Sequence, residues 1–93
     1  MSIREPVFDG KRLRALRKRR GLSAEKSAHR ANVSTRHFRR LEAGQRPNTA
    51  AITLARIALV LDTTVEYLLG LTDDDRPIGR LFWFTISTHG EGR

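Results

Sequence analysis

The feature that most restricts how this chain can fold is a pair of serines, Ser23 and Ser34, separated by the length of one short helix. A serine hydroxyl can accept a hydrogen bond from the unpaired backbone N–H groups at the start of a helix. Asn32, just before the second serine, tolerates the left-handed backbone conformation of tight turns. These residues predict two short helices, over about 24–31 and 35–43, joined by a tight turn.

Small and apolar residues occupy the positions that a close crossing of these two helices needs. Ala28 lies in the middle of the first helix, where a larger side chain would push the second helix away. Val33 lies in the turn, and Phe38 and Leu41 lie one turn apart on the second helix, so all three can face one core. Two short helices joined in this way form a helix-turn-helix, which we expect over residues 23–43.

Helical signals continue on both sides of this motif. Asp9 can cap a helix over residues 10–20, which Gly21 would end, and Leu13 and Leu16 would face inward.

A fourth helix is predicted over residues 49–61, with an apolar stripe at helical spacing that we expect to face the core. The stripe consists of Ile52, Ala55, Ala58 and Leu59, widened by Ile57 and Leu61. A short fifth helix is predicted over 65–69, with a capping box formed by Thr63 and Glu66 and an apolar face of Val65, Leu68 and Leu69.

We therefore expect an all-α, compact five-helix domain over residues 10–71, preceded by an irregular arm over 1–9. The last part of the chain, 72–93, differs in composition. Residues 72–77 form an acidic linker, and residues 81–87 are aromatic and β-branched, which favours a strand-like tail. Three of the six aromatic residues lie in this tail.

The charge is strongly segregated along the chain. Residues 1–46 hold 14 basic and 4 acidic side chains, a net charge of +10, whereas residues 47–93 hold 4 basic and 6 acidic ones, a net charge of −2. Solubility does not require such segregation, so the pattern indicates a polyanionic partner on one face. The chain has no cysteine, which excludes disulfides and thiolate chemistry and is typical of a reducing cytoplasm.

The combined pattern resembles the lambda-repressor/Cro-like (Xre-type) helix-turn-helix domains of bacterial and phage regulators, over residues 11–71. The resemblance rests on Leu13-Arg14-Ala15-Leu16-Arg17, Gly21-Leu22-Ser23, Ala28, Val33-Ser34, Leu41-Glu42-Ala43-Gly44, Pro47, Leu54-Ala55-Arg56-Ile57-Ala58 and Val65-Glu66-Tyr67-Leu68-Leu69-Gly70. It implies five helices, with the third as the recognition helix in the major groove of double-stranded DNA. It also implies transcriptional control, with repression as the expected form, by a homodimer on a pseudo-palindromic operator in the cytoplasm, at the nucleoid.

Family position suggests Thr35, Arg36 and Arg40 as contacts to bases, with Arg39 able to contact a base or a phosphate. An arginine can bond guanine O6 and N7 together. Phosphate contacts are expected at the helix starts and in the loop after the third helix, and the candidates are Ser23, Ser34, Gln45, Arg46, Arg30 and His37.

A first-helix arginine often pairs with a glutamate near the end of the recognition helix in this family, and Arg17 and Glu42 hold these positions. Two residues depart from the family pattern. Ala24 stands where a glutamine usually contacts phosphate and braces the recognition helix, and Ser27 stands where a larger apolar residue is usual. We expect that phosphate contact to be lost and the second helix to pack less firmly.

The main alternative is a protein-binding module that uses the tail. An exposed strand there could pair with another chain, either a second copy, which we favour, or a toxin, as in an antitoxin. Its contact residues would be Leu81, Phe82, Trp83, Phe84 and Ile86. Binding to RNA or to DNA without sequence preference fits less well, because the aromatic residues are not interleaved with the basic ones.

No enzyme, metal, cofactor or membrane function is expected. The Ser23-Ala24-Glu25-Lys26 sequence matches a serine–lysine pattern of some acyl-transfer enzymes, but a capping serine needs its oxygen for backbone donors and the partner motifs are missing. The histidines lack the spacing of metal ligands, and no apolar run approaches the roughly 20 residues that span a bilayer.

Overall fold

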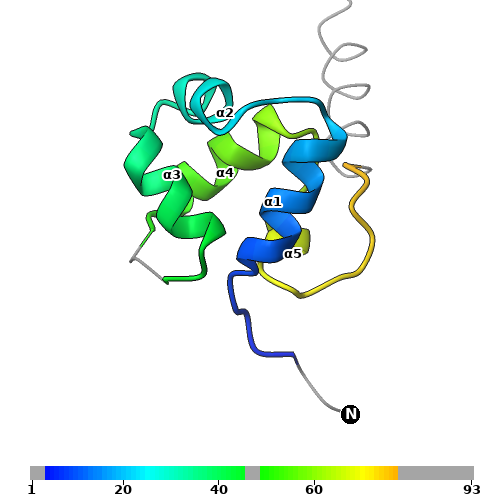
Figure 1. The fold of residues 1–93 in the computed structure, drawn as a ribbon. Coiled ribbons are helices and arrows are strands. Elements are labelled where there is room, and N and C mark those ends of the chain that lie inside the picture. The colour runs from blue at the N-terminus through cyan, green and yellow to red at the C-terminus, as the bar shows by residue number, and fades with distance from the viewer. Residues whose placement is uncertain (1–3, 46–48, 78–93) are drawn as a thin grey trace, which may run out of the picture.

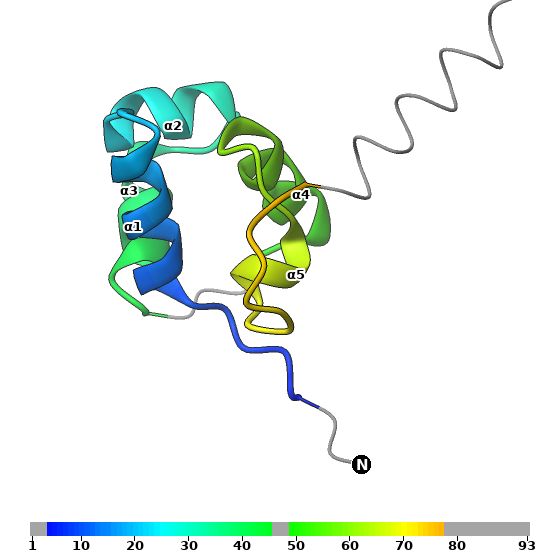
Figure 2. The same cartoon turned by 90° about the vertical axis from the view of Figure 1, so that its right-hand side faces the viewer.

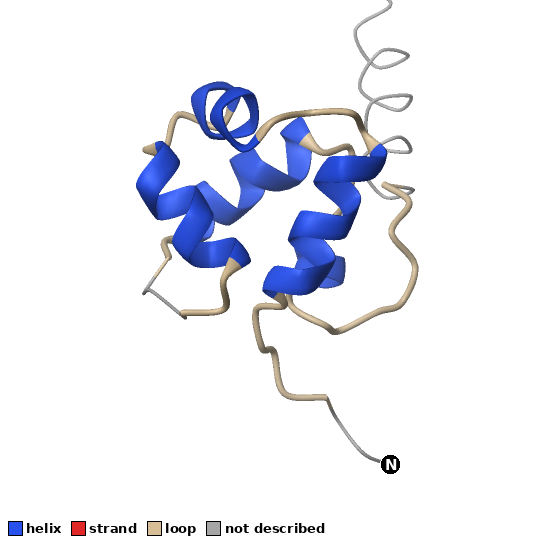
Figure 3. Cartoon of the chain, in the orientation of Figure 1, coloured by secondary structure: helices blue, strands red, loops and turns tan. Residues whose placement is uncertain are grey.

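The computed structural model describes residues 4–45 and 49–77. Its helices are α1 (Gly10–Arg19), α2 (Ala24–Arg30), α3 (Thr35–Glu42), α4 (Ala51–Val60) and α5 (Val65–Leu68). Loops join these helices, and the described residues contain no strand, as Figure 3 shows. No helix among these residues is long and apolar enough to cross a membrane. The predicted all-α, five-helix fold is confirmed, while the tail over residues 81–87 lies outside the described residues.

The turn between α2 and α3 has the conformation that the sequence predicts. The hydroxyls of Ser23 and Ser34 accept hydrogen bonds from the N–H groups of Lys26 and His37, each at 3.0 Å. Asn32 has a φ of 59°, which asparagine adopts more easily than most residues. The turn therefore needs no glycine, and α3 begins at a fixed place.

The helices surround one core. Leu13 and Leu16 of α1, Phe38 and Leu41 of α3, and Leu68 of α5 are at most 1% exposed. α3 packs against α1 and α2, α2 also packs against α4, and α5 packs against α1 and α4, an arrangement that can be followed in Figure 2. α3 is thus held from two sides while its remaining face is open to solvent.

The predicted inward face of α4 is wrong in part. Ile52 and Leu59 are 64% and 57% exposed, and Ala55 is also exposed. The buried side chains of this region are Leu54, Ile57, Ala58 and Leu61. Because α4 is apolar around most of its circumference and carries a single charged residue, helical spacing alone allowed two inward faces. Of the predicted stripe, Ile57, Ala58 and Leu61 face the core, whereas Ile52, Ala55 and Leu59 do not.

The start of α5 also differs from the prediction. Thr64 caps this helix, because its hydroxyl accepts a hydrogen bond from the Tyr67 N–H at 3.1 Å. Thr63 is buried, and its hydroxyl donates to the carbonyl oxygen of Asp75 at 2.8 Å. The capping box of Thr63 and Glu66 is therefore wrong, since a partner far along the chain takes the Thr63 hydroxyl.

Residues 72–77, here called the acidic segment, lie beside α1 (Figure 1). Arg12 and Arg19 of α1 form ion pairs with Asp73 and Asp75, at 2.5 and 2.6 Å. The stretch that the sequence indicated as an acidic linker is therefore docked on the helical domain, and it neutralises part of the charge of α1.

One buried polar group in α2 lacks a partner. Ser27 is 0% exposed, and its hydroxyl has no hydrogen-bond partner among the described residues. A buried hydroxyl without a partner costs about 1–3 kcal/mol. The serine at this position therefore lowers the stability of the fold, while the less firm packing expected for α2 stays a prediction.

Gly10 marks the closest approach between α1 and α3, and we expect that Gly10→Ala destabilises the fold. A Cβ atom at Gly10 would lie 2.7 Å from the carbonyl oxygen of Glu42 and closer still to that of Leu41. Overpacking of this kind costs about 1–3 kcal/mol, although alanine is the better helix former. Urea unfolding followed by circular dichroism measures the change.

Lys11→Ala, at the exposed neighbouring position, is the control and should leave the free energy of unfolding nearly unchanged. A Gly10→Ala variant as stable as the wild type would contradict the close approach of these two helix ends.

Candidate nucleic-acid interface

α3 presents three arginines and a threonine on one open surface. Phe38 and Leu41 are buried on one side of the helix, whereas Arg36, Arg39 and Arg40 are exposed and Thr35 is half-buried. A shallow depression on the outer side is lined by Thr35, Arg36, Arg39, Arg40, Ala43 and Gln45. The structure thus brings together the four side chains that the sequence proposed as base contacts.

The three arginines of this surface differ in what holds them. Arg36 is exposed and has no ion-pair or hydrogen-bond partner within the described part of the chain. Arg39 forms an ion pair with Glu25 of α2. The Arg40 Nε donates a hydrogen bond to the Gln45 side-chain oxygen at 3.2 Å. Arg36 is therefore the arginine that can reorient most widely, whereas the other two have preferred directions.

Glu25 is a member of this surface that the sequence interpretation did not assign to it. A hydrogen bond with its own backbone N–H, and then the Arg39 guanidinium, lower the pKa of Glu25. The carboxylate is therefore charged at neutral pH and connects α2 to α3. An acidic residue in the first turn of a helix is a sequence signal for favourable helix-dipole contact, but it does not reveal which basic residue the carboxylate meets.

The proposed phosphate contacts lie at different places around α3. Ser23 and Ser34 are exposed at the starts of α2 and α3, and each hydroxyl keeps its own proton as a donor while it accepts the capping bond. Arg30 is exposed at the end of α2. The His37 ring is half-buried and its Nε2 lies 3.4 Å from a threonine hydroxyl that precedes α4. Arg46 lies outside the described residues.

Arg17 and Glu42 form the ion pair expected from the sequence. The Arg17 Nε and Nη2 donate to the two carboxylate oxygens of Glu42 at 2.5 and 3.2 Å. Both side chains are largely buried, with 13% and 10% exposure. Arg17 Nη1 also donates to the Leu22 carbonyl oxygen at 2.8 Å. One guanidinium therefore connects α1, the loop before α2 and the end of α3.

Other arginines of this region serve the fold, which the sequence did not indicate. Arg20 donates to the carbonyl oxygens of Leu61 and Asp62 at 2.9 and 3.2 Å, at the C-terminal end of α4. The Arg12 guanidinium lies 4.4 Å from the centre of the Tyr67 ring, a favourable cation–π contact. The basic surplus of the first half is therefore not wholly available to a partner.

We expect that Glu42→Ala lowers the free energy of unfolding by about 3 kcal/mol, because it leaves the largely buried Arg17 without its counter-charge. The matched control is Glu25→Ala, which removes a carboxylate from an exposed pair and should cost little. Urea unfolding of both variants gives the comparison. Equal losses would contradict a special structural role for the Arg17–Glu42 pair.

Solved structures with the same arrangement of helices are regulators. One is the crystal structure of SinR, the master regulator for biofilm formation, in complex with DNA. Its sequence is 30% identical to this chain and the TM-score is 0.61; the match covers 64% of this chain and 95% of that chain. A complex of the SinR and SinI proteins is 25% identical, also with a TM-score of 0.61, and covers 85% of this chain and 79% of that chain. No curated protein matches the chain.

The resemblance to lambda-repressor/Cro-like domains, expected from the sequence, is confirmed by these structures. The family model described as a helix-turn-helix domain matches residues 10–77, from the first residue of α1 to the end of the acidic segment. This chain belongs to the helix-turn-helix domain family.

Proposed function

We propose that this protein binds double-stranded DNA in a sequence-specific manner, with α3 in the major groove, and regulates transcription. The observation that carries the proposal is the outer face of α3, where Arg36, Arg39 and Arg40 are exposed on a helix whose inner face is fixed in the core. The likeness to SinR, which has been crystallised in complex with DNA, supports the same conclusion.

Within the major groove, the residues near the start of α3 are those that reach base edges. Arg36 would bond guanine O6 and N7 in a bidentate manner, since no internal partner restrains it among the described residues. Thr35 would contact a base through its hydroxyl or a thymine through its methyl group. Arg40 would approach the DNA with its side chain held by the hydrogen bond to Gln45.

Phosphate contacts would flank these base contacts. The N-terminal ends of α2 and α3 carry exposed N–H groups and the hydroxyls of Ser23 and Ser34, which favour an anion. Arg30, His37, Gln45 and Arg46 would add side-chain contacts at the ends of the surface. Such contacts fix the position and the orientation of the protein on the duplex.

The biological form that we propose is a repressor that acts as a homodimer on a pseudo-palindromic operator in the cytoplasm, at the nucleoid. The second candidate function is a protein-interaction module that pairs through residues 81–87 with another copy or with a different protein, as an antitoxin does. The observation that favours this candidate is the likeness to SinR in its complex with SinI.

Selection of bound duplexes from a random DNA pool at physiological salt tests the proposed function. We expect enrichment of a two-fold symmetric motif whose half-sites lie about 10 base pairs apart. A single unpaired half-site would retain sequence-specific binding but contradict the homodimer. Salt-sensitive binding without any enriched motif would contradict a sequence-specific regulator and favour the protein-interaction candidate.

We expect that Arg36→Ala weakens binding to the selected site by about 1–3 kcal/mol and relaxes the preference at one base pair. Arg36 is exposed, so the substitution should leave the fold intact. Fluorescence anisotropy with the selected duplex, and with a duplex altered at each position in turn, measures both effects.

Arg30→Ala is the matched control, an exposed arginine proposed to contact phosphate. It should weaken binding to all duplexes alike and reduce the dependence of log Kd on log salt by about 0.9. If Arg36→Ala behaves in the same way as Arg30→Ala, then Arg36 contacts phosphate and not a base.

A further inference from the structure

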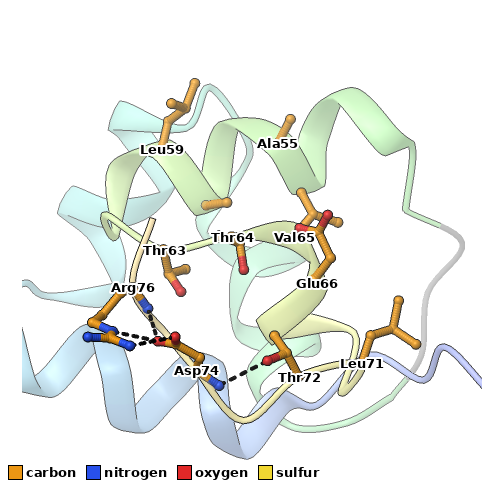
Figure 4. A pocket seen from close by; sticks show the side chains of 11 residues that line it. Ala55, Leu59, Thr63, Thr64, Val65, Glu66, Leu71, Thr72, Asp74 and Arg76 are labelled. Atoms are coloured by element: carbon orange, nitrogen blue, oxygen red, sulfur yellow. Dashed lines mark hydrogen bonds and ion pairs between the residues drawn. The ribbon is translucent and has the colours of Figure 1, made fainter. Parts of the chain in front are cut away.

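A groove lies between α4, α5 and the acidic segment (Figure 4). Its volume is about 670 Å³, within the range of pockets that hold small organic groups. Ala55 and Leu59 of α4 line one side, and Val65 and Leu71 line another. This is the apolar face of α4 that the sequence predicted to be buried. The molecule therefore has a concave apolar surface on the side of the exposed face of α4.

Two apolar side chains that line the groove are exposed among the described residues. Leu59 is 57% and Leu71 37% exposed, and both belong to the lining of the groove. A connected exposed apolar surface on a small protein commonly marks a place where another apolar group binds. The chemistry of the lining therefore calls for an uncharged, aromatic or aliphatic partner.

The described chain ends at the rim of this groove. Arg76 lines the groove, and its N–H and side chain donate to the Asp74 carboxylate at 2.9–3.0 Å. The hydrogen bonds from Arg76 lower the pKa of Asp74 to about 2, so this pair stays charged at neutral pH. Figure 2 shows the end of the acidic segment, in orange, next to α4. Residue 77 therefore lies at a fixed place beside the groove.

The sequence that follows has the composition that the groove requires. Residues 81–87 are Leu-Phe-Trp-Phe-Thr-Ile-Ser, with no charged side chain. Only residues 78–80 separate this segment from the rim, and three extended residues reach roughly 10 Å. A tether this short gives the segment a millimolar effective concentration at the groove, which a second copy reaches only in concentrated solution.

We propose that the groove between α4 and α5 binds the aromatic segment 81–86 of the same chain. The segment covers Leu59 and Leu71, and the groove removes apolar side chains of the segment, Trp83 among them, from water. The proposal is independent of DNA binding, because Ala55, Leu59 and Leu71 belong to other elements than α3.

The fluorescence of Trp83 tests this proposal in the full chain, since Trp83 is its only tryptophan. We expect a blue-shifted emission and strong protection from the quencher acrylamide. Leu59→Glu places a charge in the lining and should shift the emission to the red and abolish the protection. Circular dichroism confirms that this variant, altered at an exposed residue, keeps its helices.

Ile52→Glu is the matched control, since Ile52 is 64% exposed on the same helix but does not line the groove, and it should leave Trp83 protected. Protection should also persist at dilutions at which sedimentation shows a monomer. Three results would overturn the proposal: an unprotected Trp83 in the wild type, equal effects of the two glutamates, or protection that disappears as a dimer dissociates, which would assign the groove to the segment of a second copy.

Discussion

The contact between Arg17 and Glu42 is the interaction on which the outer surface of α3 depends most. α3 has 8 residues, and an isolated helix of fewer than about 12–15 residues is marginal in water. Its structure and direction must therefore come from its surroundings. Phe38 and Leu41 fix its inner face, and the Arg17 guanidinium fixes its last turn against α1 and against the loop before α2. The arginines on the outer face are placed only because this inner contact is made.

A second connection to α3 lies next to the position where the family usually has a glutamine. Ala24, which stands in place of the usual glutamine, is 8% exposed and belongs to the core, so it offers no polar group. Its neighbour Glu25 reaches Arg39 instead. An exposed ion pair adds little to stability, but it restricts the directions that the Arg39 side chain can take. An ion pair thus connects α2 to α3 beside Ala24, which itself has no polar group to do so.

Local signals predicted local structure well in this chain. Ser23, Ser34 and Asn32 determine where helices start and turn within a few residues, and the structure follows them. The predictions failed where the burial or the hydrogen bonds of a side chain depend on groups far along the chain. α4 is apolar on two sides, so only the packing of the other helices selects Leu54 over Ile52 and Leu59.

The same reason explains the side-chain contacts that the sequence did not reveal. Thr63 takes its partner from residue 75, and the sequence has no local signal for that contact. Likewise, the pairing of Arg39 with Glu25 depends on how two helices cross. The sequence predicted which residues gather on the outer face of α3, but it could not predict which of them hold one another.

The docked acidic segment also makes the charge of the domain uneven. Asp73 and Asp75 neutralise Arg12 and Arg19 on one side of the domain, while Arg36 on α3 keeps an uncompensated charge within the described residues. An uneven charge distribution experiences a torque in the field of a polyanion. This torque acts over a distance of about one Debye length, before any atoms touch. Near the DNA proposed above, the domain would therefore tend to turn its uncompensated basic side chains toward the duplex before contact.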